Sequence, residues 1–132
     1  MRKYFHNTVF GIFWILCAFI LLVNGLSAWQ QKTDTVKLYT EIAGDYEFEM
    51  GMELMTVSFW EEDGKLLGAP PGETPEEIIP VEGEELKFSV TIGSGEEYIL
   101  TFSRDDSGKI TQCLMETGMG ETLGERVGEP SS

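Results

Sequence analysis

Alternation between apolar and polar side chains is the feature that most constrains the fold of this chain. From Leu86 to Ile92, every second residue is apolar, and Lys, Ser and Thr lie between them. Successive side chains of a β-strand point to opposite faces, so this pattern predicts a strand with one face toward a core and the other toward water. The same period of two recurs in residues 45–49, 55–59 and 98–103.

Turn signals separate the predicted strands at close, even spacing. Asp63-Gly64 lies between two apolar pairs and predicts a tight hairpin, because both residue types tolerate positive φ. The stretch from Pro70 to Pro75 predicts one longer loop. About eight short strands joined by hairpins favour an antiparallel meander, and eight strands are enough to close on themselves. The predicted fold class is all-β, a small antiparallel up-and-down β-barrel.

The first 28 residues have the layout of a secretory signal peptide. Arg2 and Lys3 precede a run of 15 uncharged residues, Val9 to Val23, and small residues follow it. This order is typical of an export signal, with cleavage expected between residues 25 and 29. The run is somewhat shorter than the roughly 20 residues of a spanning helix, which favours the signal peptide. A retained signal-anchor is the alternative, because Tyr4 and Phe5 would lengthen the apolar stretch slightly. The predicted location is secreted or periplasmic, or membrane-anchored if the signal is retained.

The rest of the chain is predicted to form one domain, residues 38–127, between two short polar segments. Residues 29–37 are interpreted as a linker and residues 128–132 as a disordered tail. Leu38 and Ile42 are four residues apart, which predicts a short helical turn that Gly44 ends.

The chain is strongly acidic, with a formal net charge of −14. Removal of the signal would take Arg2 and Lys3 with it and leave seven basic residues against 23 acidic ones, a net charge of −16. Such a surface repels phosphate backbones, so nucleic acid is not expected as a partner, and anionic lipid headgroups are disfavoured. The simplest interpretation of the charge is that it keeps a small exported protein dispersed.

The predicted mature domain lacks the residues of common catalytic and metal sites. His6, the single histidine, lies in the signal segment, which excludes a Ser-His-Asp triad and a His-ligated metal from the domain. Cys113 would be the only cysteine left, and it is interpreted as a small buried hydrophobe. Residues 105–108 offer oxygens to calcium, but they lack the spacing of a calcium-binding loop and predict a turn. No cofactor and no metal site are predicted.

Carboxylates keep one enzymatic alternative open. Two carboxylates that flank one cleft can act as acid and base in a hydrolase. Four glutamates lie at predicted strand ends and are the candidates for such a pair: Glu61, Glu62, Glu96 and Glu97. Glutamates at surface turns are far commoner than catalytic pairs, so a non-enzymatic domain is the preferred prediction.

Aromatic and methionine side chains are candidates for the barrel interior. A barrel of eight strands either fills its interior with side chains or holds one small ligand, and a filled interior is the preferred prediction. Trp60 breaks the alternation that Phe59 follows, so one of the two is expected to face outward or lie at a rim. The candidate contacts to a ligand or partner are Trp60, Phe59, Tyr98 and Phe88.

Several of these motifs together resemble a known family. The motifs are an apolar residue before Gly44-Asp45-Tyr46, the Asp63-Gly64 hairpin, the segment Ser107-Gly108-Lys109-Ile110 and the closing Arg126-Val127. In this order they are similar to the lipocalin-like domain that is often fused to β-lactamase-like serine peptidases. The resemblance implies a barrel that accompanies an enzyme, and no catalytic residue transfers from it, because the nucleophile of the family lies in the preceding domain.

The sequence thus predicts an exported, non-enzymatic binding module. It would contact a protein partner, for which the resemblance implies a serine hydrolase of the cell envelope, or a small apolar ligand. The alternatives are a carboxylate-based extracytoplasmic hydrolase and a membrane-tethered form of the binding module.

Overall fold

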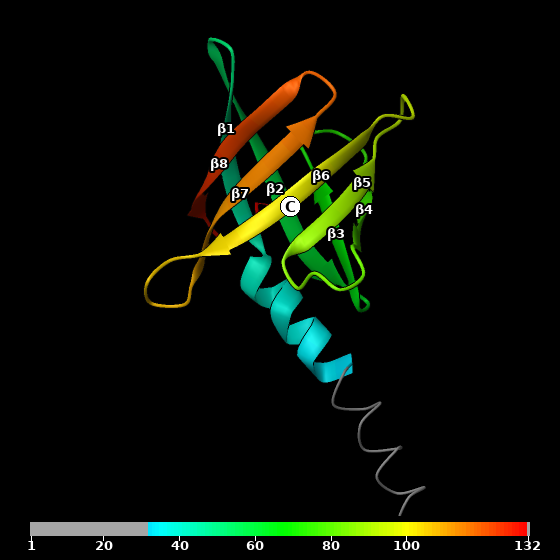
Figure 1. Ribbon diagram of the computed structural model, residues 1–132, viewed down its shortest axis with the longest axis vertical. Helices are drawn as coiled ribbons and strands as arrows, with labels where there is room; N and C mark the ends of the chain where they lie inside the picture. Colours follow the sequence, from blue (N-terminus) through cyan, green and yellow to red (C-terminus); the bar gives the residue numbers. More distant parts are fainter. Residues whose placement is uncertain (1–31, 132) are drawn as a thin grey trace, which may run out of the picture. The chain divides into compact units, whose positions relative to one another are not determined.

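A closed β-barrel forms most of the described protein. The computed structural model describes residues 32–131, and the chain divides into two units, Met1–Thr35 and Val36–Ser132. Residues 32–35 of the first unit are helical, and the second unit contains helical residues 36–42 and the barrel (Figure 1). The strands are β1 (Gly44–Met50), β2 (Glu53–Glu62), β3 (Lys65–Ala69), β4 (Glu76–Pro80), β5 (Lys87–Thr91), β6 (Glu97–Arg104), β7 (Ile110–Thr117) and β8 (Gly120–Gly128).

The topology is up-and-down. Each strand pairs antiparallel with the next along the chain, and β8 pairs with β1 to close the barrel. The predicted fold class is therefore confirmed. Alternate connections lie at opposite ends: those after β2, β4 and β6 share one end with helical residues 36–42, which we term the closed end. Those after β1, β3, β5 and β7 lie at the other, the open end.

The hairpin predicted at Asp63-Gly64 is present between β2 and β3. Asp63 has φ 52° and Gly64 has φ 81°, the pair of positive values that a type I′ turn requires. The Gly64 N–H also donates to Glu61 Oε1 at 2.8 Å. A turn with this twist matches the twist of the strands and sets their register, Glu62 opposite Lys65.

The helical segment before β1 is longer than the short turn that the sequence predicts. Residues 32–42 are helical, so part of the segment interpreted as a linker is helix, and the helix ends two residues before Gly44. Tyr39 and Ile42 are buried in the core. The Tyr46 hydroxyl donates to the Ile42 carbonyl at 2.8 Å and joins the helix to β1. Burial of this hydroxyl raises the pKa of Tyr46.

Aromatic rings fill the closed half of the barrel. Tyr46, Phe59 and Phe102 form a triangle of edge-to-face contacts with centroids 5.3–5.6 Å apart. Phe88 joins Phe102 at 5.7 Å and Tyr39 at 6.1 Å, which extends the cluster to the helix. These separations are those at which aromatic pairs attract each other. The interior of the closed half is therefore filled with side chains, as predicted for the barrel.

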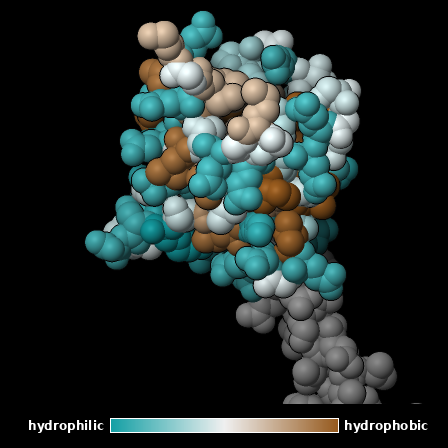
Figure 2. Space-filling model, turned by 45° about the horizontal axis from the view of Figure 1, so that its top comes forward, coloured by the Kyte–Doolittle hydropathy of each residue, from teal (hydrophilic) through white to brown (hydrophobic). Residues whose placement is uncertain are grey.

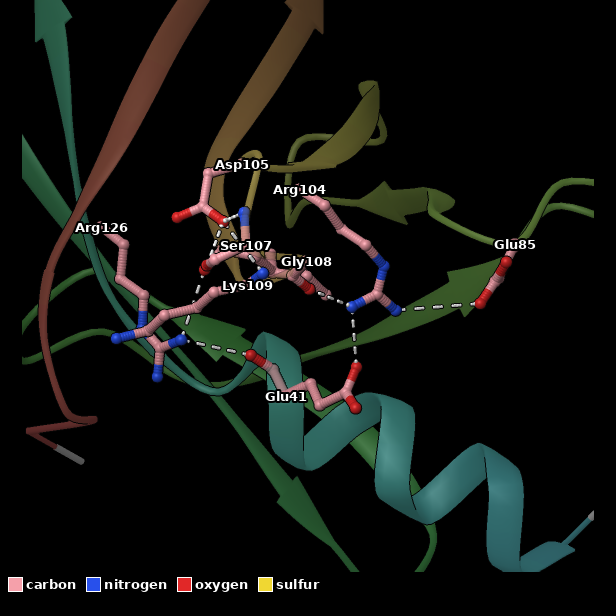
Figure 3. Close-up of polar contacts among 9 residues, drawn as sticks. Glu41, Glu85, Arg104, Asp105, Ser107, Gly108, Lys109 and Arg126 are labelled. Carbon is pink, nitrogen blue, oxygen red and sulfur yellow. Dashed lines mark hydrogen bonds and ion pairs between the residues drawn. The ribbon is translucent and has the colours of Figure 1, made fainter.

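Two arginines hold the closed end together (Figure 3). Arg126 donates to the backbone carbonyl of Glu41 at 3.3 Å. It also donates to the carbonyls of Ala43 at 2.6 Å and Ile110 at 3.3 Å. Arg104 forms an ion pair with Glu41 at 3.0 Å and donates to the Gly108 carbonyl at 2.8 Å. The carbonyls at the end of a helix have no partner within it, and Arg126 supplies one for Glu41 and for Ala43 just beyond.

The C-terminal segment is attached to the barrel, although a frayed tail is predicted from residue 128. Gly128 ends β8, and the Ser131 N–H donates to Asp45 Oδ1 at 3.0 Å. The Ser58 hydroxyl donates to the same oxygen at 2.5 Å. Burial acts to raise the pKa of Asp45, but the hydrogen bonds from Ser58 and Ser131 outweigh it and lower the pKa. This carboxylate is the physical reason that Ser131 is held.

The predicted signal peptide, residues 1–28, lies outside the described residues. No helix within residues 32–131 is long and apolar enough to cross a membrane.

Candidate ligand pocket

The open half of the barrel contains a pocket. Its volume is about 710 Å³, and it lies between the β3–β4 connection, residues 70–75, and the β5–β6 connection, residues 92–96. Figure 2 shows hydrophobic residues between hydrophilic ones on a face of the barrel. The volume falls within the range of about 300–1,000 Å³ that is typical of small-molecule sites.

Aliphatic and methionine side chains form the wall of the pocket. They come from β2, β4, β5, β6 and β7, so almost the whole circumference contributes. The main contributors are Met55, Val57, Ile78, Val90, Leu100 and Met115. Methionine is unbranched and adaptable, so such a wall can adjust to ligands of different shape.

Phe59 separates the pocket from the filled half. Its ring belongs to the aromatic cluster and also lines the pocket, so it forms the floor. The ring lies against Gly68 on the neighbouring strand, where a Cβ would be only 2.8 Å from it. Glycine at this position allows the Phe59 ring to approach the wall closely.

Glutamates and hydroxyl groups occupy the mouth. Glu73, Glu76, Thr74, Ser94 and Tyr98 line the pocket there. The Tyr98 hydroxyl donates to Glu96 Oε2 at 3.3 Å, and partial burial, together with the Glu96 charge, raises the pKa of Tyr98. Among residues 32–131, those that line the pocket include no Lys, Arg or His.

The positions of Glu73 and Glu76 follow from local structure. The Glu73 N–H donates to the Pro70 carbonyl at 3.2 Å, and Gly72 has φ 77°, which together define a type II turn. Glu76 begins β4 opposite Gly68, two residues before the buried Ile78. Alternation therefore places Glu76 on the inward face of β4.

The four predicted contact residues divide into two pairs. Phe59 and Tyr98 line the pocket. Phe88 is fully buried in the aromatic cluster of the closed half and does not line it. Trp60 follows the inward Phe59, so it faces the outside of the barrel, where it is half-buried.

The four candidate catalytic glutamates do not converge on one site. Glu61 and Glu62 end β2 at the closed end, whereas Glu96 ends the β5–β6 connection and Glu97 begins β6, both at the open end. Glu61 already accepts a hydrogen bond within its hairpin, and the other three are exposed.

Within residues 32–131, no group of acidic, histidine or cysteine side chains is arranged to hold a metal ion. Asp105 Oδ1 accepts from Ser107 N, Ser107 Oγ and Lys109 N at 2.6–3.1 Å, so it stabilises the predicted turn. The hydrogen bonds from Ser107 and Lys109 lower the pKa of Asp105. Cys113 is unpaired and fully buried, as predicted, and burial raises the pKa of its thiol.

Sequence reasoning missed the two mouth glutamates, and it placed most of the apolar wall on inward strand faces without identifying a pocket. The alternation in Leu86–Ile92 identified Val90 as inward-facing, but gave no means to decide which inward residues border a space. Glu73 lies within the proline-rich loop and Glu76 follows it, and nothing in their spacing marks them. The register of β3 with β4 places Glu76 at the open end, and the pocket lining includes Glu73 as well.

Comparisons of this chain with protein-family models, with curated proteins and with solved structures find no match. The resemblance to the lipocalin-like domain stays a prediction that rests on sequence motifs.

Proposed function

We propose that this protein is an exported, non-enzymatic binding module that holds one small apolar ligand in the open half of its barrel. The observation that carries the proposal is the pocket of about 710 Å³ with an aliphatic and methionine wall. Burial of apolar ligand surface is favourable by about 0.8 kcal/mol for each methylene group. The wall offers few groups that would orient a polar substrate.

The distribution of carboxylates supports a binding role over a hydrolytic one. The glutamate pairs of β2 and β6 lie at opposite ends of the barrel, so they share no cleft. Glu73 and Glu76 both lie on one side of the mouth, from a single connection and the strand after it. An acid and base that act together must flank the bond that breaks.

Export is proposed from the sequence of residues 1–28, as is the membrane-tethered alternative. Intact-mass and N-terminal analysis of the protein recovered from outside the cytoplasm separates the two. A chain that begins between residues 26 and 29 supports cleavage, and a chain that retains residues 1–28 supports the tethered form.

A protein partner is a second candidate, supported by an exposed apolar surface. Met52 and Met119 are fully exposed at the tips of the β1–β2 and β7–β8 hairpins, and Leu54 and Leu123 are exposed beside them. Since β1 pairs with β8, these hairpins are neighbours at the open end. A serine hydrolase of the cell envelope is the partner that the sequence resemblance implies. Capture of such an enzyme by the wild type, but not by a Met52→Ser/Met119→Ser variant, would support this role.

The ligand role is tested by calorimetric titration of the exported protein with decanol below its solubility limit. We expect saturable binding of one molecule. In Val90→Phe, the larger ring would occupy the pocket, so binding should be lost while the thermal unfolding transition is kept. Absence of binding to the wild type, or equal binding to Val90→Phe, would contradict the proposal.

A further inference from the structure

The two ends of the barrel differ sharply in charge. Every Lys and Arg of residues 36–131 lies on the helix or at the closed end: Lys37, Lys65, Lys87, Arg104, Lys109 and Arg126. The strand ends and connections of the open end carry glutamates alone as charged residues: Glu49, Glu53, Glu73, Glu76, Glu77, Glu96, Glu97, Glu116 and Glu121. The charged side chains around the mouth of the pocket are therefore all negative.

Ion pairing accentuates this difference. All three ion pairs in residues 32–131 involve Arg104 or Arg126, at the closed end. Glu73 and Glu76 have neither an ion pair nor a side-chain hydrogen bond with another described residue, although both line the pocket. Their negative charges are thus available to a positively charged group that enters the mouth.

We propose that the pocket selects amphiphiles with a cationic head, such as alkylammonium compounds. The inference rests on the proposed ligand-binding function and adds the charge of the ligand to it. The alkyl chain would lie among Met55, Val90 and Leu100, above the Phe59 floor. The ammonium group would remain at the mouth beside the carboxylates of Glu73 and Glu76.

Two further features favour this head group. The Tyr98 ring lines the same pocket, and aromatic faces attract cations. A cleft lined by charges of one sign also concentrates a ligand of opposite charge and speeds its association. A carboxylate or phosphate head would meet repulsion at the mouth, with no Lys or Arg in the lining to offset it.

Calorimetric titration of the exported protein with three ligands of equal chain length tests the inference. The ligands are decyltrimethylammonium, decanol and decanoate, each below its micelle concentration and at low salt. We expect the ammonium compound to bind about tenfold more tightly than the alcohol, as two partly exposed charge pairs would give, and decanoate to bind most weakly. Added salt should reduce the preference for the cation.

The decisive variant is Glu73→Gln/Glu76→Gln, with Glu47→Gln/Glu125→Gln as its matched control. Glu47 and Glu125 pair across β1 and β8 on the outer wall, so the control removes the same net charge away from the mouth. The mouth variant should lose most of the tenfold preference and keep decanol binding within about twofold, while the control keeps the preference.

The outcomes separate this inference from the function on which it rests. Equal losses in the mouth and control variants, or decanoate binding as tight as that of the ammonium compound, would overturn cation selection and leave the binding function intact. No binding of any of the three ligands would overturn the binding function itself.

Discussion

The closed and open halves of this barrel are built from the same alternating strands, yet one is filled and the other is hollow. Rings from β1, β2, β5 and β6 meet edge to face in the closed half, with Tyr39 of the helix beside them. Valine, leucine, isoleucine and methionine form most of the apolar wall of the open half, with Tyr98 at its mouth. The rings of the closed half contact one another in the barrel interior, whereas the side chains of the open half border a pocket. Contact between inward-facing rings thus distinguishes the filled half from the half that contains the pocket.

The largest expected contrast comes from truncation in each half. Phe102→Ala should lower the free energy of unfolding by about 3–5 kcal/mol, because Phe102 contacts three other rings and its loss leaves a cavity. Val90→Ala should lower it by about 1–2 kcal/mol, since Val90 already borders the pocket. Urea denaturation measures both. Equal losses would contradict the division into two halves.

A substitution that overpacks the barrel interior should have a smaller effect on the free energy of unfolding. A Cβ on Gly124 would lie 2.5 Å from the Phe48 ring, so Gly124→Ala should destabilise the barrel by about 1–3 kcal/mol. Gly118→Ala is the matched control, because a Cβ there meets no atom within 4 Å. Thermal unfolding of the two variants checks the difference. A Gly124→Ala variant as stable as the control would show that Phe48 can move aside.

The smallest expected effect concerns the Asp45 contact with the C-terminal segment. Since the pKa of Asp45 is lowered in the folded state, its contribution to stability is present above the unfolded pKa of about 4 and is lost as the pH falls through the lower folded pKa. Asp45→Asn should therefore lose part of the acid dependence of stability, and Ser58→Ala should lose some of it too. Urea titrations between about pH 3 and pH 7 measure this. A wild-type acid profile in Asp45→Asn would contradict it.

Local pattern was sufficient to predict the barrel, because alternation and turn chemistry act within a few residues. Asp63-Gly64 predicted its hairpin, and Cys113 its burial. The pocket depends instead on which inward side chains share a level of the barrel, and that follows from register between strands. Glu76 opposite Gly68 is one such case, and the attachment of Ser131 to Asp45, 86 residues away, is another. Neither relationship leaves a local signal in the sequence.

The most direct test of the two-half account is a methyl NMR titration of the protein with decanol. We expect the methyl resonances of Met55, Val90, Leu100 and Met115, which line the pocket, to shift with one saturable affinity. Those of Ile42 and Ile110, which are buried at the closed end, should not move. Shifts confined to the exposed Leu54 and Leu123, or no shift at any methyl group, would contradict the claim that the open half is a binding cavity.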